Sequence, residues 1–180
     1  MKIISGYRGG QYIKVPKTIR VRPTTGKSKE GIFNILNNSF DFENLKVLDL
    51  FCGTGNISYE FESRGANVTS IDININTIKF LKKEVNDLNL NIYVVKSDVI
   101  SYLKKTIQTF DIIFADPPYN FSKSEYHNII NIIFNNNLLK NDGLFLLEHS
   151  NKNDFMNHYN FFKIIKYGGC FFSFFKNINN

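Results

Sequence analysis

The sequence predicts an α/β fold: a doubly wound, Rossmann-like sheet of seven mostly parallel strands with an antiparallel last strand, preceded by a small N-terminal hairpin and helix. Two observations support this prediction. From residue 45 onward, short apolar runs alternate with amphipathic stretches, which is typical of parallel strands joined by helices. The last two apolar runs are separated only by Gly168 and Gly169, so the strands that they predict should pair antiparallel at one edge.

Each expected element depends on a local signal. Residues 3–4 and 11–15 flank a glycine-rich turn and predict a hairpin, and Thr24 or Thr25 can cap a helix that ends near Asn37. Apolar runs without a polar face predict strands covered on both sides, at residues 45–51, 67–71, 92–95, 110–115, 144–148, 161–167 and 170–175. Apolar residues at helical spacing predict helices at about 56–64, 74–88, 99–106, 124–137 and 151–157, with a turn at 141–143. We therefore expect an N-terminal extension over residues 1–38 and a sheet domain over residues 39–180.

Positive charge is concentrated at the start of the chain. The 180 residues have a formal net charge of +6, but residues 1–30 carry eight basic side chains against one acid, and the other 150 residues sum to −1. A basic segment interleaved with Gly, Tyr and Pro favours contact with an RNA backbone over a merely solvated cationic face. The candidate phosphate contacts are Arg8, Arg20 and Arg22, followed by Lys17, Lys27 and Lys29.

Composition argues against several classes of protein. No apolar run approaches the roughly 18 to 20 residues of a membrane span, and no signal-peptide core opens the chain, so a cytoplasmic protein is expected. The three histidines have no metal-ligand spacing with each other or with Cys52 and Cys170, so no metal is expected. The two cysteines are expected to be free thiols.

Glycines and acids follow the first three strands of the expected sheet. Gly53 and Gly55 come after the first strand, where a glycine backbone can approach a ligand and a helix begins with free N–H groups. Asp72 ends the second strand and can accept two hydrogen bonds from a ribose diol, and Asp98 follows the third and can bind an adenine amine. Ligands of such sheets bind at these carboxyl ends, which predicts a nucleotide-type site. The residues assigned to it are Asp49, Phe51, Gly53, Gly55, Asp72, Ile73, Asp98, Val99 and Asp116.

Two kinds of cofactor are candidates for this site. A dinucleotide would favour a third glycine at position 58, which is Ser58 here, and its pyrophosphate gains nothing from Asp49 beside the glycines. A sulfonium ligand with an amino-acid tail does gain from that carboxylate, because opposite charges attract. S-adenosylmethionine is therefore favoured over a nicotinamide cofactor.

The most specific motif is Asp116-Pro117-Pro118-Tyr119, directly after an apolar strand. Two prolines fix φ twice and remove two N–H donors, which leaves the carbonyl groups of a rigid loop available. The Asp116 carboxylate and the Pro117 carbonyl can each accept one N–H of an exocyclic amine and aim its lone pair at a methyl donor. Tyr119 can stack on the base, which must leave its stack to enter the site. The alternative is a proline-rich turn without a catalytic role.

With these motifs the sequence resembles class I S-adenosylmethionine-dependent methyltransferases, and more narrowly the RsmD family, over essentially its whole length. The segments that carry the resemblance are 3–10, 22–25, 29–30, 33–36, 48–55, 63–66, 114–119 and 167–169. Many members have Arg-Val-Arg-Glu where this chain has Lys27-Ser28-Lys29-Glu30.

The resemblance implies an enzyme that methylates N2 of a guanine in 16S rRNA, guanine 966 in the numbering of that RNA. It implies S-adenosylmethionine as cofactor, and as partner 16S rRNA within the 30S subunit or an assembly intermediate; we expect a monomer. Two alternatives stay open: methylation of N6 of adenine in RNA or DNA, where the Asp-Pro-Pro-Tyr motif also serves, and a non-catalytic RNA-binding assembly factor that has kept the fold. The absence of a separate DNA target-recognition domain at this length argues against a DNA enzyme.

Overall fold

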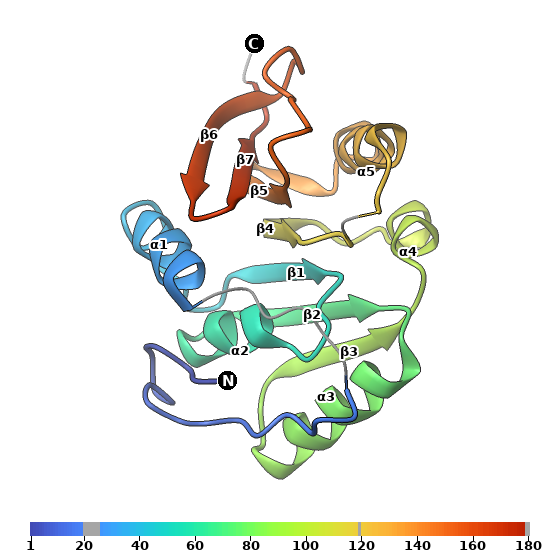
Figure 1. Cartoon of the computed structure of the whole chain (residues 1–180). Helices are drawn as coiled ribbons and strands as arrows, with labels where there is room; N and C mark the ends of the chain where they lie inside the picture. Colours follow the sequence, from blue (N-terminus) through green and yellow to red (C-terminus); the bar gives the residue numbers. More distant parts are fainter. Residues whose placement is uncertain (20–25, 119, 179–180) are drawn as a thin grey trace.

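The strands of the protein form one sheet. The structure, a computed structural model, describes residues 1–19, 26–118 and 120–178, and within these ranges seven strands pair in the order β3-β2-β1-β4-β5-β7-β6 (Figure 1). They are β1 (Lys46–Leu50), β2 (Asn67–Asp72), β3 (Ile92–Lys96), β4 (Phe110–Ala115), β5 (Leu139–His149), β6 (Phe161–Tyr167) and β7 (Cys170–Phe175). Neighbouring strands are parallel from β3 to β5, and β7 is antiparallel to both β5 and β6. The predicted sheet is therefore confirmed.

The strand order reverses between β1 and β4. The chain first builds outward from β1 to β3 and then returns to add β4 on the other side of β1. At such a switch point the connections leave the two central strands in opposite directions, which opens space for a ligand at their carboxyl ends. The segments that follow β1 and β4 therefore lie at the same edge of the sheet.

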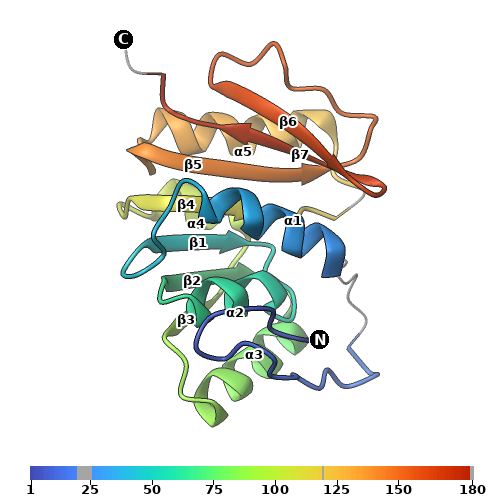
Figure 2. The same ribbon diagram turned by 90° about the vertical axis from the view of Figure 1, so that its left-hand side faces the viewer.

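Helices cover both faces of the sheet (Figure 2). One face carries α1 (Gly26–Asn37), α2 (Asn56–Ser63) and α3 (Ile75–Asp87), and the other carries α4 (Val99–Lys105) and α5 (Lys123–Asn135). Because successive side chains of a strand point to opposite faces, Val47 joins the core under the first set of helices and Leu48 joins the core under the second. This two-sided burial explains why the strands read as continuous apolar runs.

Polar side chains cap three of the helices. The Asn74 side chain accepts a hydrogen bond from Asn76 N, and the Asp98 side chain accepts one from Ser101 N. Ser122 and Glu125 form a reciprocal capping box at the start of α5. These caps satisfy N–H groups that a helix leaves without partners, and they fix the starts of α3 and α4 just after β2 and β3.

The first residues of the chain, which we call the N-terminal segment (residues 1–19), lie against α2 and the end of α3 (Figures 1 and 2). Lys2 and Tyr12 form an antiparallel bridge, which is the predicted hairpin in a very short form. Ile3 and Ile13 are each 2% exposed and share one core cluster with α1, α2 and α3. The segment is therefore packed into the protein at Ile3 and Ile13, whereas Ile4, Tyr7 and Tyr12 are exposed.

One expected helix is wrong. Residues 151–157 form turns, in which Asp154 Oδ1 accepts a hydrogen bond from Met156 N at 2.8 Å. Asn, Asp and Ser side chains that bond nearby backbone groups compete with helix formation, and this segment is rich in them.

The start of β5 also differs from the prediction. The strand spans Leu139–His149, so the turn expected at 141–143 lies within it. Pairing with β4 moves from Phe110–Leu139 to Ile112–Leu144, which leaves the intervening residues of β5 as an irregularity in the ladder. The expected cap of α1 at Thr24 or Thr25 lies outside the described residues.

Within the described ranges, none of the helices combines the length and the apolar character that crossing a membrane requires. The same ranges contain no cluster of three or more His, Cys, Asp and Glu side chains with the arrangement of a metal site.

Gly6 brings the N-terminal segment into close contact with α2. A Cβ added at Gly6 would lie 1.8 Å from Ser63 O, whereas a Cβ at Gly10 would meet nothing within 4 Å. Both glycines have a left-handed backbone conformation, with φ of 86° and 90°. Both alanine variants therefore carry the same backbone strain, and only Gly6→Ala adds a steric overlap. We expect Gly6→Ala to lower the free energy of unfolding by about 1–3 kcal/mol more than Gly10→Ala. Urea denaturation measures this difference, and equal losses would contradict the close contact.

Candidate active site

The loop after β1, residues 51–55, which we call the glycine loop, has a left-handed backbone at three positions. Phe51, Gly53 and Gly55 have φ of 62°, 54° and 86°. Glycine adopts such values without strain but phenylalanine does not, so the surroundings must hold the loop in place. A Cβ at Gly55 would lie 2.6 Å from a methyl carbon of Leu81 in α3, so a larger residue here would require the Leu81 side chain to shift as well as a strained backbone.

Asp72 orders this glycine loop from the neighbouring strand. Its Oδ2 accepts a hydrogen bond from Gly53 N at 2.8 Å, and its Oδ1 accepts one from Asn74 N at 2.7 Å. The carboxylate therefore connects the end of β2 both to the glycine loop and to the start of α3. Its assignment as the ribose ligand stays a prediction.

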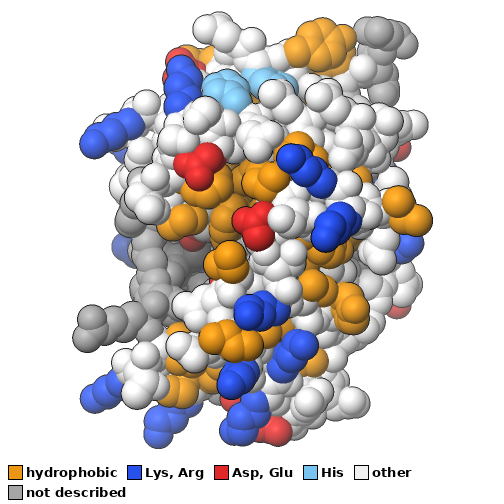
Figure 3. Space-filling model, turned by 90° about the vertical axis from the view of Figure 1, so that its right-hand side faces the viewer, with side chains coloured by type: hydrophobic (Ala, Val, Ile, Leu, Met, Phe, Trp, Pro, Cys, Tyr) orange, Lys and Arg blue, Asp and Glu red, His pale blue; other side chains and the backbone are white. Residues whose placement is uncertain are grey.

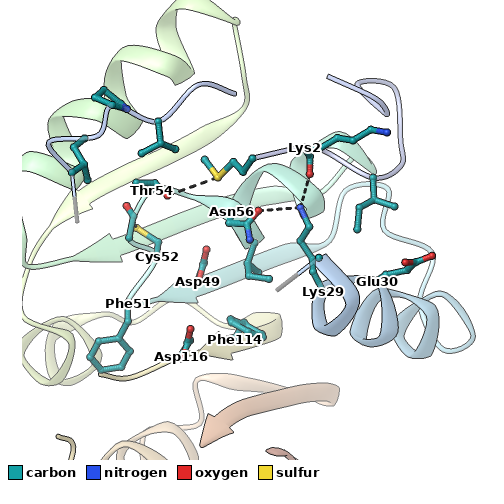
Figure 4. A pocket seen from close by; sticks show the side chains of 18 of the residues that line it. Lys2, Lys29, Glu30, Asp49, Phe51, Cys52, Thr54, Asn56, Phe114 and Asp116 are labelled. Carbon is teal, nitrogen blue, oxygen red and sulfur yellow. Dashed lines mark hydrogen bonds between the residues drawn. The ribbon is translucent and has the colours of Figure 1, made fainter. Parts of the chain in front are cut away.

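A cavity of about 760 Å³ opens beside the glycine loop, between α1 and the N-terminal segment (Figure 4). This volume lies in the range of sites for nucleoside-sized ligands. Four of the predicted cofactor residues line it, namely Asp49, Phe51, Gly53 and Asp116. The N-terminal segment contributes Met1, Lys2, Ile4, Val15, Pro16, Lys17 and Ile19.

Asp49 is the buried carboxylate of this cavity, with 1% of its surface exposed. Ser58 Oγ donates a hydrogen bond to Asp49 Oδ2 at 2.5 Å, and Ser70 Oγ lies 2.8 Å from the same hydroxyl. Burial raises the pKa of Asp49 to about 7; repulsion from Asp116 and Asp72 adds to the rise, and the Ser58 hydrogen bond opposes it. A cation in the cavity would relieve this repulsion and favour the ionised carboxylate.

Strand register places Asp116 near Asp49. β1 and β4 are adjacent and parallel, with Leu50 paired to Ala115, so Asp116 directly follows the last pair. Figure 4 shows the two carboxylates at the same side of the cavity. Residues 67 positions apart in the sequence thus meet at the switch point.

The segment after Asp116 is only partly described. Pro117 is buried and Pro118 is exposed, while Tyr119 lies outside the described residues. The Phe51 and Phe121 rings make an edge-to-face contact with centroids 5.3 Å apart, which joins the loop after β1 to the loop after β4.

The other predicted cofactor residues lie outside the cavity. Ile73 follows Asp72 and is 65% exposed. Asp98 is exposed and caps α4, while Val99 is buried in the first turn of that helix. These residues follow β2 and β3, so a ligand that reached all of them would extend from the cavity past the glycine loop toward the β3 edge.

Two of the predicted RNA contacts are engaged within the protein. Arg8 Nη1 donates to Gln11 Oε1 at 3.3 Å, and Arg8 Nη2 donates to Leu88 O. Lys29 is 3% exposed, and its Nζ lies 2.7 Å from Glu60 Oε1. Burial lowers the pKa of Lys29, and Glu60 opposes this. The prediction that Lys29 meets RNA phosphates is therefore corrected, because its charge is already paired below the surface.

The remaining predicted RNA contacts divide into two groups. Lys17 and Lys27 are exposed, and Lys17 lines the cavity. Arg20 and Arg22 lie outside the described residues.

Sequence reasoning missed two parts of the site. The cavity wall formed by the N-terminal segment has no sequence signal, because only tertiary packing brings Thr54 Oγ1 within 3.8 Å of Met1 Sδ. Ser58 was noted only as a missing glycine, although its hydroxyl binds Asp49. A hydroxyl one helical turn into α2, facing the preceding strand, is the signal that could have indicated this role.

Asp49→Asn should remove a pH dependence of stability. The carboxyl keeps its proton to about pH 7 in the folded state but ionises near 3.8 when unfolded, so its contribution to stability is fully present below 3.8 and lost as the pH rises to about 7. The two pKa values differ by the equivalent of about 4 kcal/mol. The variant should therefore gain stability relative to wild type progressively over this interval. Urea denaturation at several pH values measures the gap, and a gap independent of pH would contradict the raised pKa.

Comparison with known proteins identifies the family. A family model described as conserved hypothetical protein 95 matches residues 1–176. Ribosomal RNA small subunit methyltransferase D from Buchnera aphidicola subsp. Baizongia pistaciae is 36% identical over 153 residues, covering 84% of this chain and 76% of that protein. The Escherichia coli K12 protein of the same name is 30% identical over 155 residues, covering 85% and 76%. The solved structure of a putative methyltransferase, yhhF, from Escherichia coli matches with a TM-score of 0.84 at 25% identity, covering 99% of both chains.

The family model and the solved structure span nearly the whole chain, and the structural match agrees with the fold described above. The chain belongs to the family of conserved hypothetical protein 95, which is the RsmD family of class I methyltransferases.

Proposed function

We propose that this protein transfers a methyl group from S-adenosylmethionine to N2 of a guanine in 16S rRNA. The observation that carries the proposal is the meeting of Asp49 and Asp116, from the two central strands, in one cavity beside a left-handed glycine loop. The names of the relatives from Buchnera and Escherichia coli support an RNA of the small ribosomal subunit as substrate.

The charges around the cavity fit a cationic cofactor. Asp72 and Asp116 both repel Asp49, and a sulfonium and an ammonium group would offset this repulsion. We assign the amino-acid end of the cofactor to the cavity residues Asp49, Phe51, Gly53 and Asp116, with Gly55 at the following helix start. We assign the ribose and adenine to Asp72, Ile73, Asp98 and Val99. When bound, S-adenosylmethionine supplies an electrophilic methyl group on a positively charged sulfur.

Asp116 and Pro117 act on the nucleophile in this proposal. An exocyclic guanine amine is a poor nucleophile, because its lone pair is delocalised into the ring. The Asp116 carboxylate and the Pro117 carbonyl each accept one N–H, which favours a pyramidal nitrogen with its lone pair aimed at the methyl group. The two prolines hold these acceptors rigidly, so the contribution is mainly positioning. Tyr119 is assigned to stack on the base.

The N-terminal extension, residues 1–38, is assigned to bind RNA beside the methyltransferase domain, residues 39–180. Within its described part, the exposed basic side chains are Lys2, Lys14, Lys17 and Lys27. Lys2 and Lys17 also line the cavity, so they could guide a phosphate backbone toward it. The other face of the molecule also carries basic side chains, some among acidic and apolar ones and several close together in the lower half of the view (Figure 3). We propose that the protein acts as a monomer on the 30S subunit or an assembly intermediate.

The direct test is transfer of labelled methyl groups from S-adenosylmethionine to small subunits from a strain that lacks the enzyme, followed by nucleoside analysis. N2-methylguanosine is the expected product. N6-methyladenosine would instead identify an adenine methyltransferase, and RNA binding without transfer would identify a non-catalytic assembly factor.

Asp116→Ala should separate chemistry from cofactor binding. We expect kcat to fall at least about 100-fold, because the variant loses an acceptor that orients the amine. The Kd for S-adenosylmethionine, measured by calorimetry, should weaken far less than kcat falls, because Asp49 remains in the cavity to pair with the cationic cofactor. Asp142→Ala, an exposed acid in β5, is the matched control and should keep wild-type kcat. Unchanged turnover in Asp116→Ala would remove Asp116 from the mechanism.

Charge reversal at Lys14 and Lys17 should weaken RNA binding. The double variant Lys14→Glu/Lys17→Glu should lose about tenfold or more in affinity for RNA at low salt. The slope of log affinity against log salt concentration should become shallower by the equivalent of about one to two phosphate contacts. Lys104→Glu/Lys105→Glu on α4 makes the same charge change at exposed positions on the other face. If both double variants lose affinity equally, net charge decides binding and the N-terminal extension is not the contact surface.

A further inference from the structure

The Lys29 ammonium joins three parts of the protein: α1, which carries it, the N-terminal segment and α2. It donates to Lys2 O at 2.7 Å in the N-terminal segment and to Asn56 Oδ1 at 3.0 Å at the start of α2. It also pairs with Glu60 Oε1 at 2.7 Å (Figure 4). An ammonium has three N–H donors, and these three acceptors match them one for one. Lys29 therefore has no donor left for a ligand and can influence the cavity only through its partners.

Glu60 extends this cluster on its other side. Its side chain is fully buried, its Oε1 also accepts a hydrogen bond from Ile4 N at 2.6 Å, and its Oε2 lies 2.5 Å from Arg64 Nη1. The Arg64 guanidinium in turn lies over the Phe33 ring of α1, 4.3 Å from its centroid. Glu60 thus holds the backbone of the N-terminal segment directly, and Arg64 balances its charge even without Lys29.

Two of the partners of Lys29, Lys2 and Asn56, line the cavity. Lys2 belongs to the N-terminal segment, whose Met1 side chain contacts Thr54 of the glycine loop. Asn56 is the residue directly after Gly55, at the first turn of α2. If the purpose of Lys29 were only to neutralise Glu60, the contact with Asn56 would be unnecessary, because Arg64 already pairs with Glu60.

We propose that Lys29 is a positioning residue that sets the glycine loop relative to the N-terminal segment, so that displacing the segment weakens cofactor binding. The inference deepens the proposed function and rests on it for the identity of the cofactor. It links the segment assigned to RNA with the site assigned to S-adenosylmethionine. Occupation of one should then alter affinity at the other, by reciprocal linkage.

The test is a double-mutant cycle on cofactor affinity. The variants are Lys29→Met, Asn56→Ala and the combination, with the Kd for S-adenosylmethionine measured by calorimetry on the full chain. We expect each single variant to weaken binding about fivefold or more, which is the lower range of coupling between sites. The combination should be no more than about twofold weaker than Lys29→Met, because both changes break the same contact. If the fold-losses in affinity of the two single variants multiply in the combined variant, Asn56 acts independently of Lys29 and the proposal is overturned.

Two further variants separate positioning from stability. Lys29→Arg keeps the charge and several donors, so it should recover most of the affinity lost in Lys29→Met. Tyr7→Phe removes a different link between the N-terminal segment and α2, the hydrogen bond from Tyr7 Oη to Glu62, away from Asn56. Even if Tyr7→Phe lowers the melting temperature as much as Lys29→Met does, it should keep the Kd for S-adenosylmethionine within about twofold of the wild-type value. An equal loss of affinity in Tyr7→Phe, or no recovery of affinity in Lys29→Arg, would show that Lys29 only stabilises the fold and does not position the glycine loop.

A measurement without cofactor distinguishes this inference from the proposed function. Hydrogen exchange of the free protein should show that Lys29→Met raises exchange of the Ile4 and Tyr59 amides together, while Tyr7→Phe leaves both unchanged, because Ile4 N still donates to Glu60 and Lys29 still binds Lys2 and Asn56. Should Lys29→Met fail to fold, Lys29→Gln replaces it in the cycle and in this measurement. Wild-type protein that binds no S-adenosylmethionine would refute the proposed function, and the exchange result would still decide whether Lys29 couples the two segments. Unchanged exchange at Tyr59 would overturn the coupling.

Discussion

The burial of Asp49 under the glycine loop is the constraint on which the rest of the site depends. A carboxylate without solvent needs donors or a cation, and Ser58 provides hydrogen bonds to Asp49 from both its hydroxyl and its backbone. Asp116, directly after the adjacent strand, adds repulsion, so a cation in the cavity would favour the ionised form of Asp49. The left-handed backbone of Phe51, Gly53 and Gly55 then lets the chain turn tightly over this carboxylate and begin α2 at once.

The N-terminal segment is part of the same construction. Ile3 and Ile13 anchor it in the core, and the buried cluster of Lys29, Glu60 and Arg64 fixes its backbone against α2. A buried charge cluster gives little net stability, because desolvation offsets most of the attraction. The cluster instead fixes geometry, because Glu60 accepts a hydrogen bond from Ile4 N and so holds the N-terminal segment against α2. The segment assigned to RNA thus shares its supports with the site assigned to the cofactor.

The predicted elements succeeded where local signals and tertiary packing agree. Apolar runs such as Phe110–Ala115 could be read as strands because both faces of the sheet are covered, and Asn74 and Asp98 mark helix starts through their caps. The expected helix at 151–157 failed because side chains such as Asp154 bond the local backbone instead. The start of β5 was misplaced because an Asn-Asp-Gly sequence suggests a turn, while pairing with β4 continues from Leu139.

Strand periodicity and chain order were enough to predict the sheet architecture and the edge at which Asp49 and Asp116 meet, because they fix which residues end neighbouring strands. The surroundings of the charged side chains depend on packing that no local pattern shows. Lys17 and Lys29 look alike in the sequence, yet one is exposed beside the cavity and the other is paired with Glu60 below the surface. The physical reason is that burial depends on what packs above a side chain, and the acceptors of Lys29 come from positions 2, 56 and 60, which no local pattern brings together.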